Sequence, residues 1–339
     1  MEAAHRGKQS FVFDEAPAIL SFASVAGRKE AEGPLGTSFD RTAKDTKFGQ
    51  KTWEKAETQM QKTAMTLALQ RAKLREDQLD AAFVGDLLNQ CVGSSFCMRD
   101  RDIPTFGLYG ACSTMAESLM LAAMSVNAGY CRRALALTSS HFASSERQYR
   151  FPLAYGGQRT PTAQWTVTGA GAAVIGQKGD GPFLLNATVG SIVDMGIRDA
   201  ANMGAAMAPA AYETLRAHFD DLRTSPEDYD LIVTGDLGKL GYQIVKALFD
   251  RDGVKLEDRY QDCGVMIFDL ERQDVHCGGS GCGCSASVLC GHLLQRMRQR
   301  EIGKLLFCGT GALLSPLTTQ QGESIPAVCH AVTISAERS

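Results

Sequence analysis

Cys112 is the residue whose surroundings in the sequence best suit covalent chemistry. It lies in the segment GACST at 110–114, where small residues are typical of a tight turn that opens a helix. Unpaired N–H groups and the helix dipole at such a place stabilise a thiolate, so we expect the pKa of Cys112 to lie below its usual value. Such a thiol is a candidate nucleophile. The alternative is a small buried residue at a strand-to-helix turn, and position alone does not separate the two.

Polar side chains that could join Cys112 in a binding site follow two predicted strands. His141 ends the strand predicted at 133–139, and the ends of strands line clefts in α/β sheets. Asp86, Asn89 and Gln90 follow an earlier apolar run. The alternatives are structural, with His141 bonded to the backbone at a strand end and Asp86 capping the next turn.

Two arginines lie in the polar segment 142–166, which is too long for a simple connection and is expected to be a functional loop. The guanidinium groups of Arg147 and Arg150 could pair with carboxylates of a ligand. The alternative is a solvated loop face. The segment leads into a small-residue strand at 166–176, whose glycines permit close approach of another backbone.

An internal repeat sets the frame for these residues. The segments DAAFVGDLL and DLIVTGDLG each combine an acid, an apolar run and Gly-Asp-Leu, so that Asp86 and Asp236 occupy the same place. Each apolar run has the length and composition of a buried strand. Amphipathic helical patterns precede the two runs, at 52–74 and 209–223.

A second pair of features follows the first in the same order. The segment GCSA at 283–286 opens another predicted helix, which makes Cys284 the counterpart of Cys112. Both parts of the chain thus read strand, loop, helix, strand, a pattern typical of parallel α/β packing. We predict two pseudo-duplicated halves, 1–180 and 181–339.

Composition excludes several classes of function. The formal net charge is -3 and the isoelectric point is about 6.1, which argues against a nucleic-acid-binding surface. The eleven cysteines show no zinc-site spacing, so we predict free buried thiols and no metal site. Neither a signal peptide nor an apolar segment long enough to cross a bilayer is recognisable. We expect a soluble, cytoplasmic-type protein.

The duplicated α/β unit with Gly-Ala-Cys-Ser at a helix start resembles the thiolase and ketoacyl-synthase superfamily. The resemblance implies an α/β thiolase-like fold of five layers, α/β/α/β/α, with Cys112 at the position of the acyl-accepting nucleophile. Within the superfamily the chain is similar to the stage V sporulation protein AD family. The similarity is carried by GDLLNQ (85–90), GACST (110–114), TSSH (138–141), SERQYR (145–150), YGGQ (155–158), MGAAMAPAA (203–211), GGSGCGCSA (278–286) and TGALLSP (310–316).

This resemblance implies a sporulation protein that binds dipicolinic acid as its calcium complex. The ligand brings the calcium, and the resemblance implies no other cofactor. It further implies a part in dipicolinate uptake into the developing spore, and a link to germination. The implied partners are the other stage V sporulation A-operon membrane proteins at the spore inner membrane, where the protein would be peripheral. The superfamily implies a homodimer.

Superfamily catalysis uses two more polar groups, usually two histidines or a histidine and an asparagine. The first should follow the strand that begins near Asp230, where the chain has Asp236, and the second should lie in 278–286, which contains neither residue type. We therefore expect a non-catalytic protein in which Cys112 contacts the ligand.

Two other functions remain as alternatives, namely a Cys112-dependent acyltransferase and a scaffold with a vestigial pocket. Cys308 lies in CGTG, which resembles the turn where thiolases keep an acid/base cysteine, and is expected to be a packed thiol. His218 is expected to be exposed on its helix, and His276 to lie at a strand end.

Overall fold

A computed structural model describes residues 4–149 and 159–338, and its strands form two similar groups of five. In the first half the order is β6 (Thr105–Leu108), β5 (Ala81–Gly85), β7 (Arg133–Ser140), β9 (Gly169–Gly176), β3 (Ala18–Ala26). In the second half it is β12 (Tyr260–Asp262), β11 (Leu231–Thr234), β14 (Lys304–Ala312), β15 (Ala327–Ser335), β10 (Phe183–Thr188). The two groups repeat the same order of strands, so the repeat predicted from the sequence is present in the topology. They join edge to edge where β10 meets β3.

Each group of strands contains both parallel and antiparallel neighbours. β5 is parallel to β6 and β7, whereas β9 is antiparallel to both β7 and β3. The predicted parallel packing is thus present in β5, β6 and β7 but does not extend to β9 and β3. A parallel connection needs a crossover along a sheet face, but the chain that leaves β7 forms helix α5 (Phe142–Tyr149), which packs on β8 (Trp165–Thr166). The first part of the expected loop at 142–166 is thus helical.

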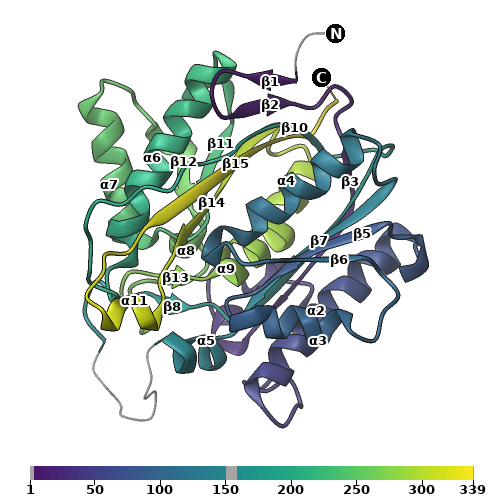
Figure 1. Cartoon of the computed structure of the whole chain (residues 1–339), viewed down its shortest axis with the longest axis horizontal. Helices are drawn as coiled ribbons and strands as arrows, with labels where there is room; N and C mark the ends of the chain where they lie inside the picture. Colours follow the sequence, from purple (N-terminus) through teal and green to yellow (C-terminus); the bar gives the residue numbers. More distant parts are fainter. Residues whose placement is uncertain (1–3, 150–158, 339) are drawn as a thin grey trace.

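Helices lie between the two groups of strands and cover their outer faces (Figure 1). The central layer holds α4 (Thr114–Asn127) and α9 (Cys282–Val288), which continues into α10 (Leu294–Arg298). The first half is covered by α2 (Trp53–Ala72) and α3 (Val92–Met98), and the second by α6 (Met203–Leu222) and α7 (Gly238–Arg251). The five-layer arrangement is therefore the one expected. Shorter elements are α1 (Arg28–Ala31), β4 (Arg41–Thr42), α8 (Cys263–Met266), β13 (Gly279–Ser280) and α11 (Pro316–Gln320).

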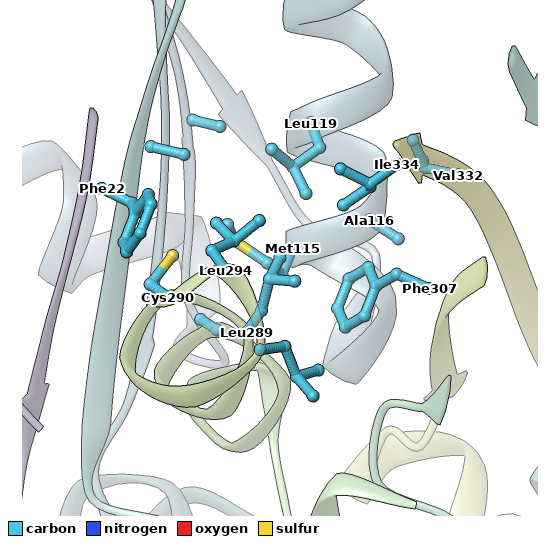
Figure 2. Close-up of a cluster of buried hydrophobic side chains, with 14 of the residues drawn as sticks. Phe22, Met115, Ala116, Leu119, Leu289, Cys290, Leu294, Phe307, Val332 and Ile334 are labelled. Atoms are coloured by element: carbon cyan, nitrogen blue, oxygen red, sulfur yellow. The ribbon is translucent and has the colours of Figure 1, made fainter. Parts of the chain in front are cut away.

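The main core lies in the central layer. Figure 2 shows Phe22 of β3, Met115 and Leu119 of α4, Leu294 of α10 and Phe307 of β14 converging between the strands of the two halves. All five are at most 2% exposed, and full burial of a side chain of this kind stabilises the fold by roughly 1.5–3 kcal/mol.

Glycines of β9 let the central helix α9 approach closely. A Cβ atom at Gly171 would lie 2.3 Å from the carbonyl oxygen of Ala286, and one at Gly169 would lie 3.0 Å from that of Gly283. The first distance is too short for a real Cβ contact and the second is tighter than most, which agrees with the close approach predicted for this strand.

The beginning of the described chain is attached to the second half. β1 (His5–Arg6) pairs with β2 (Ser10–Val12), and β2 pairs with β10. The carboxylate of Asp221, near the end of α6, accepts hydrogen bonds at 2.9 Å from the backbone N–H of Gln9 and from the Ser10 hydroxyl.

His218 differs from its prediction. It lies on the inner face of α6, fully buried, with Nδ1 2.7 Å from the Thr188 hydroxyl and Nε2 2.8 Å from the Tyr229 hydroxyl. Burial lowers the pKa of His218 to about 3, so the ring is neutral. His276 is partly exposed and is bonded through Nδ1 to the carbonyl of Thr160 at 2.7 Å. In the described parts of the chain, no helix is both long and apolar enough to cross a membrane.

Candidate functional site

Cys112 lies in a strained turn immediately before α4. The turn spans Ala111–Ser113, and Ala111 has a φ of +52°, a backbone conformation that residues other than glycine seldom adopt. Gly311 of β14 packs against this turn, since a Cβ there would lie 2.7 Å from the Gly110 carbonyl oxygen. The two halves therefore meet closely at Cys112.

The side chain of Asp236 contacts Cys112 from the second half. The Asp236 carboxylate lies close enough to the Cys112 thiol to raise the pKa of that thiol, and it accepts from the N–H of Gly281 at 2.7 Å and from the Thr310 hydroxyl at 2.8 Å. Asp236 is fully buried. Burial raises its pKa to about 6, although these hydrogen bonds act in the opposite direction.

A second buried acid, Asp262, holds the loop that carries Asp236. Its carboxylate accepts from the N–H of Leu237 at 2.8 Å, from the N–H of Gly238 at 3.0 Å and from the Thr234 hydroxyl at 2.8 Å. Burial and the charge of Asp236 raise the pKa of Asp262 to about 7. Asp262 is thus a positioning residue for Asp236.

The expectation of a lowered pKa at Cys112 is wrong. Burial is the largest effect, and it raises the pKa of Cys112 well above the usual value. The charge of Asp236 and the proximity of Cys282 act in the same direction. The sequence argument failed because it considered the helix start alone, whereas the folded chain removes that turn from water.

Cys282, rather than Cys284, shares the surroundings of Cys112. It begins α9 after Gly281, whose φ is +99°, and it packs with Cys112 and Leu87. Its thiol donates to the Ser139 carbonyl at 3.0 Å. Among the acids that raise its pKa, Asp86 has the largest effect, so each of the two aspartates of the repeat acts on a cysteine at the start of a central helix in the other half.

Asp86 itself has no polar atom left for a ligand. It is fully buried, and its carboxylate accepts from the N–H of Leu88 at 2.8 Å and from the N–H and hydroxyl of Ser94 at 2.8 and 2.7 Å. The buried carboxyl of Glu57 is close enough that burial and the charge of Asp86 raise its pKa. Asp86 therefore serves the turn-capping role that was its structural alternative.

A cavity of about 50 Å³ opens beside Cys112, with room for a few water molecules. The Ser145 hydroxyl is buried there and has no hydrogen-bond partner among the described residues. Glu146 also lines the cavity and accepts from the Thr166 hydroxyl at 2.9 Å. None of the described lining residues is a lysine or arginine. The lining is formed by Leu87, Ala111, Cys112, Ser145, Glu146, Tyr149, Thr166, Met203, Ser280, Ala312 and Leu314.

His141 lies away from this cavity. It is 1% exposed, its Nε2–H donates to the Thr46 carbonyl at 2.7 Å, and its Nδ1 accepts from the N–H of Ala143 at 3.2 Å. Both ring nitrogens therefore serve the backbone, which is the alternative considered for a strand-end histidine. Burial lowers the pKa of His141.

Asn89 and Arg147 line a different hollow, of about 280 Å³, on the side of α5. Arg147 is ion-paired with Glu54, and the Asn89 side chain accepts from the Tyr109 hydroxyl at 3.0 Å. Gln90 is exposed and lines neither hollow. Arg150 lies outside the described residues. Of the predicted ligand contacts, the structure thus places only Cys112 in the cavity.

Sequence reasoning missed Asp236, Cys282 and Ser145 as members of the site. A signal for the first two existed, because they lie in the two segments where superfamily enzymes carry their further polar groups. Only their residue types were unexpected. Cys308 is fully buried and hydrogen-bonded with Cys329 in the outer core of the second half, as expected for a packed thiol.

The described residues contain no group of three or more histidine, cysteine, aspartate or glutamate side chains that could hold a metal ion. A calcium ion bound here would therefore need most of its oxygen ligands from elsewhere.

Comparisons with known proteins agree with this fold. The chain is similar to 3-oxoacyl-[acyl-carrier-protein] synthase III from Aquifex aeolicus, with a TM-score of 0.56 at 12% identity, covering 94% of this chain and 99% of that one. It is also similar to OleA E117Q from Xanthomonas campestris, with a TM-score of 0.59 at 14% identity, covering 96% and 99% of the two chains. These likenesses identify the fold as thiolase-like.

Sequence comparison is more specific. The stage V sporulation protein AD of Bacillus subtilis is 45% identical over 326 residues, which cover 96% of each chain. The family model described as "Stage V sporulation protein AD (SpoVAD)" matches residues 7–335. With a thiolase-like fold whose cysteine is paired with an aspartate, the chain belongs to the stage V sporulation protein AD family of sporulation proteins.

Proposed function

We propose that this protein binds dipicolinate as its calcium complex in the cavity beside Cys112, and takes part in the uptake of that complex into the developing spore. The observation that carries the proposal is the cavity beside Cys112, where the buried Ser145 hydroxyl has no hydrogen-bond partner among the described residues. None of the described lining residues is a lysine or arginine that could neutralise a free dianion. The one-to-one calcium complex has no net charge and needs no such cation.

The lining suits the parts of such a complex. Calcium prefers oxygen ligands, and dipicolinate itself brings carboxylate oxygens to the ion. The unpartnered Ser145 hydroxyl can donate to a ligand carboxylate. The apolar side chains of Met203 and Leu314 line the cavity, and they must move aside, because about 50 Å³ is too small for the ligand.

The same proposal holds that the site is non-catalytic. Transfer of the Cys112 proton to Asp236 would produce a thiolate beside a neutral acid, not the ion pair that a histidine base would provide. The high pKa of Cys112 opposes that transfer. Incubation with acyl-CoA is therefore expected to leave the intact mass unchanged. A stable acyl adduct on Cys112 would favour the acyltransferase alternative.

Calorimetric titration with dipicolinate, with and without calcium, tests the proposal. We expect binding in the presence of calcium and markedly weaker binding without it. Ser145→Ala should weaken binding roughly tenfold to a hundredfold, because a hydrogen bond to a charged group contributes about 1.5–3 kcal/mol. Ser95→Ala, at an exposed serine on α3, is the matched control. Equal affinity in the Ser145 and Ser95 variants would refute the assigned site.

The proposal includes a homodimer formed through β6. This strand lies at the end of the strand order and pairs with β5 alone among the described strands, and such an edge can pair with a second copy. Phe106 is 57% exposed there. Phe106→Glu should give monomers by size-exclusion chromatography with light scattering, whereas Tyr130→Glu, at a side chain 86% exposed, should not. A monomeric wild-type protein would contradict the dimer.

We also propose that the protein acts peripherally at the spore inner membrane with the other stage V sporulation A-operon membrane proteins. Only membership of the stage V sporulation protein AD family supports this part of the proposal. Affinity purification from the membrane fraction of sporulating cells is expected to recover those proteins together with this one. Their absence from the purified material would count against the assembly.

A further inference from the structure

A second and larger hollow lies at the opposite ends of the strands and helices from Cys112. It is formed where α2 and α10 end, where β7 begins, and by the turn between β9 and β10. Its volume is about 600 Å³, which falls within the range of ligand sites. We call it the basic groove. Its lining residues are Leu20, Arg71, Ala72, Leu74, Arg133, Lys178, Gly179, Asp180, Gly181, Pro182, Met297, Arg298, Arg300 and Ala336.

The charge of the basic groove is opposite to that of the whole protein. Five of its described lining residues are cationic and only Asp180 is acidic, although the chain carries a formal net charge of -3. The cations are Arg71, Arg133, Lys178, Arg298 and Arg300. The neighbouring acids Asp40 and Glu337 pair with Arg71 and Arg300, which still leaves an excess of positive charge.

Two of the guanidinium groups are held in place by carbonyls of one strand. Arg71 donates to the carbonyl of Phe22 at 2.8 Å, and Arg298 donates to that of Leu20 at 2.9 Å. The pairing of β3 with β9 shifts register at Leu20. The Arg298 guanidinium also lies 4.3 Å from the centre of the Phe22 ring. Both cations are thus ordered before any ligand arrives, which lowers the entropic cost of binding.

The stabilisation of helix ends does not explain all the cations of the basic groove. Basic residues near the ends of α2 and α10 stabilise the helix dipoles, and this explains Arg71 and Arg298. Arg133 begins a strand and Lys178 lies in a turn. In the described structure neither of these two side chains has a hydrogen-bond or ion-pair partner. Like charges gathered around an open hollow repel one another, and a bound anion would relieve that repulsion.

We propose that the basic groove is a binding site for an anionic phosphate group, either that of a free phosphate compound or that of the headgroup of an anionic lipid. Arginine forks match phosphate oxygens in paired geometry, and lysine adds a point charge. The groove provides both types around one hollow. This site is separate from the cavity beside Cys112 in position, and the two share no described lining residue.

The double substitution Arg133→Ala with Lys178→Ala tests the proposal without disturbing the arginines that bond to β3. Calorimetry with inorganic pyrophosphate, and co-sedimentation with phosphatidylcholine vesicles containing phosphatidylglycerol, provide the two probes. Each cation near an anionic surface contributes about 1 kcal/mol, so the double variant should bind at least about tenfold more weakly. The matched control is Lys255→Ala with Arg259→Ala, two cations of the second half.

The two probes distinguish the sources of phosphate. Pyrophosphate binding without vesicle binding supports a free phosphate compound. Vesicle binding that pyrophosphate displaces supports a lipid headgroup. Binding of neither probe, or equal loss in the test and control variants, would overturn the site. Dipicolinate binding with calcium should be unchanged in the double variant, so the two proposals can fail separately.

Discussion

The carboxylate of Asp236 lies beside the thiol of Cys112, at a place where the resemblance to thiolases predicts a histidine. A histidine can take the proton and stay beside the thiolate as its counter-ion. An aspartate provides no counter-ion, and its charge disfavours the thiolate. An aspartate beside Cys112 therefore keeps the thiol protonated, whereas a histidine in the same place would activate it.

Replacing Asp236 should make Cys112 more reactive. Asp236→Asn removes a negative charge beside the thiol, so the pKa of Cys112 should fall. A fall of one unit would speed alkylation near neutral pH about tenfold. Iodoacetamide labelling followed by peptide mass spectrometry measures the rate. Cys277, the single cysteine that is not buried, is the internal reference, and Asp86→Asn, which should act on Cys282 instead, is the control. No change at Cys112 would disprove the electrostatic coupling.

His218 should make the protein less stable in mild acid. Its folded-state pKa of about 3 lies below the usual 6.5, so between these values the unfolded state binds more protons. The contribution of His218 to the free energy of unfolding should therefore fall as pH falls below about 6.5. His218→Ala should weaken this pH dependence and cost about 2–4 kcal/mol through lost packing and two lost hydrogen bonds. Urea unfolding from pH 4 to 7 tests this, with exposed His5→Ala as control. An unaltered pH profile in His218→Ala would count against it.

Glu30 should have the opposite effect on the pH dependence of stability, because its contribution to the free energy of unfolding falls as the pH rises. It is buried, it accepts from the N–H of Thr168 at 2.9 Å, and burial raises its pKa to about 7 from 4.5. The folded state then binds more protons between these values, so stability should fall as pH rises from about 4.5 to 7. The loss is about 3 kcal/mol, at about 1.4 kcal/mol for each pKa unit.

Glu30→Gln keeps a neutral side chain at all pH values, so the variant should lose about 3 kcal/mol less stability than the wild type over that range. Urea unfolding at pH 5 and pH 8 compares the two proteins. Exposed Glu32→Gln on the same segment is the control. A Gln variant that loses as much stability as the wild type would remove Glu30 as the cause.

The contact between β9 and α9 should not tolerate a methyl group. Gly171→Ala would place a Cβ 2.3 Å from the Ala286 carbonyl oxygen, so the central helix must shift. We expect a loss of about 1–3 kcal/mol or more, as for other overpacked cores. Gly107→Ala in β6, where a Cβ would meet nothing within 4 Å, is the control. Thermal unfolding measures both, and equal melting temperatures would refute the close approach.

Local patterns in the sequence predicted much of the fold and little of the site. The repeated Asp86 and Asp236 segments predicted the duplication, because a strand and its turn are encoded locally. The direction of β9 was missed, since it depends on where α5 packs. Three further properties were missed for a similar reason. They are the pKa of Cys112, the burial of His218 and the proximity of Asp236 to Cys112. Each depends on residues more than a hundred positions apart, or on solvent exclusion by the other half.

The attachment of β2 to β10 has a consequence for synthesis on the ribosome. Residues 10–12 must wait for residues 183–188 before they can pair, and the Asp221 carboxylate that holds Gln9 and Ser10 is made later still. More than half of the polypeptide must therefore leave the exit tunnel before its first strands reach their place. Until then the nascent first half exposes a sheet edge whose strands lack their partners. A chaperone that binds this edge would prevent aggregation.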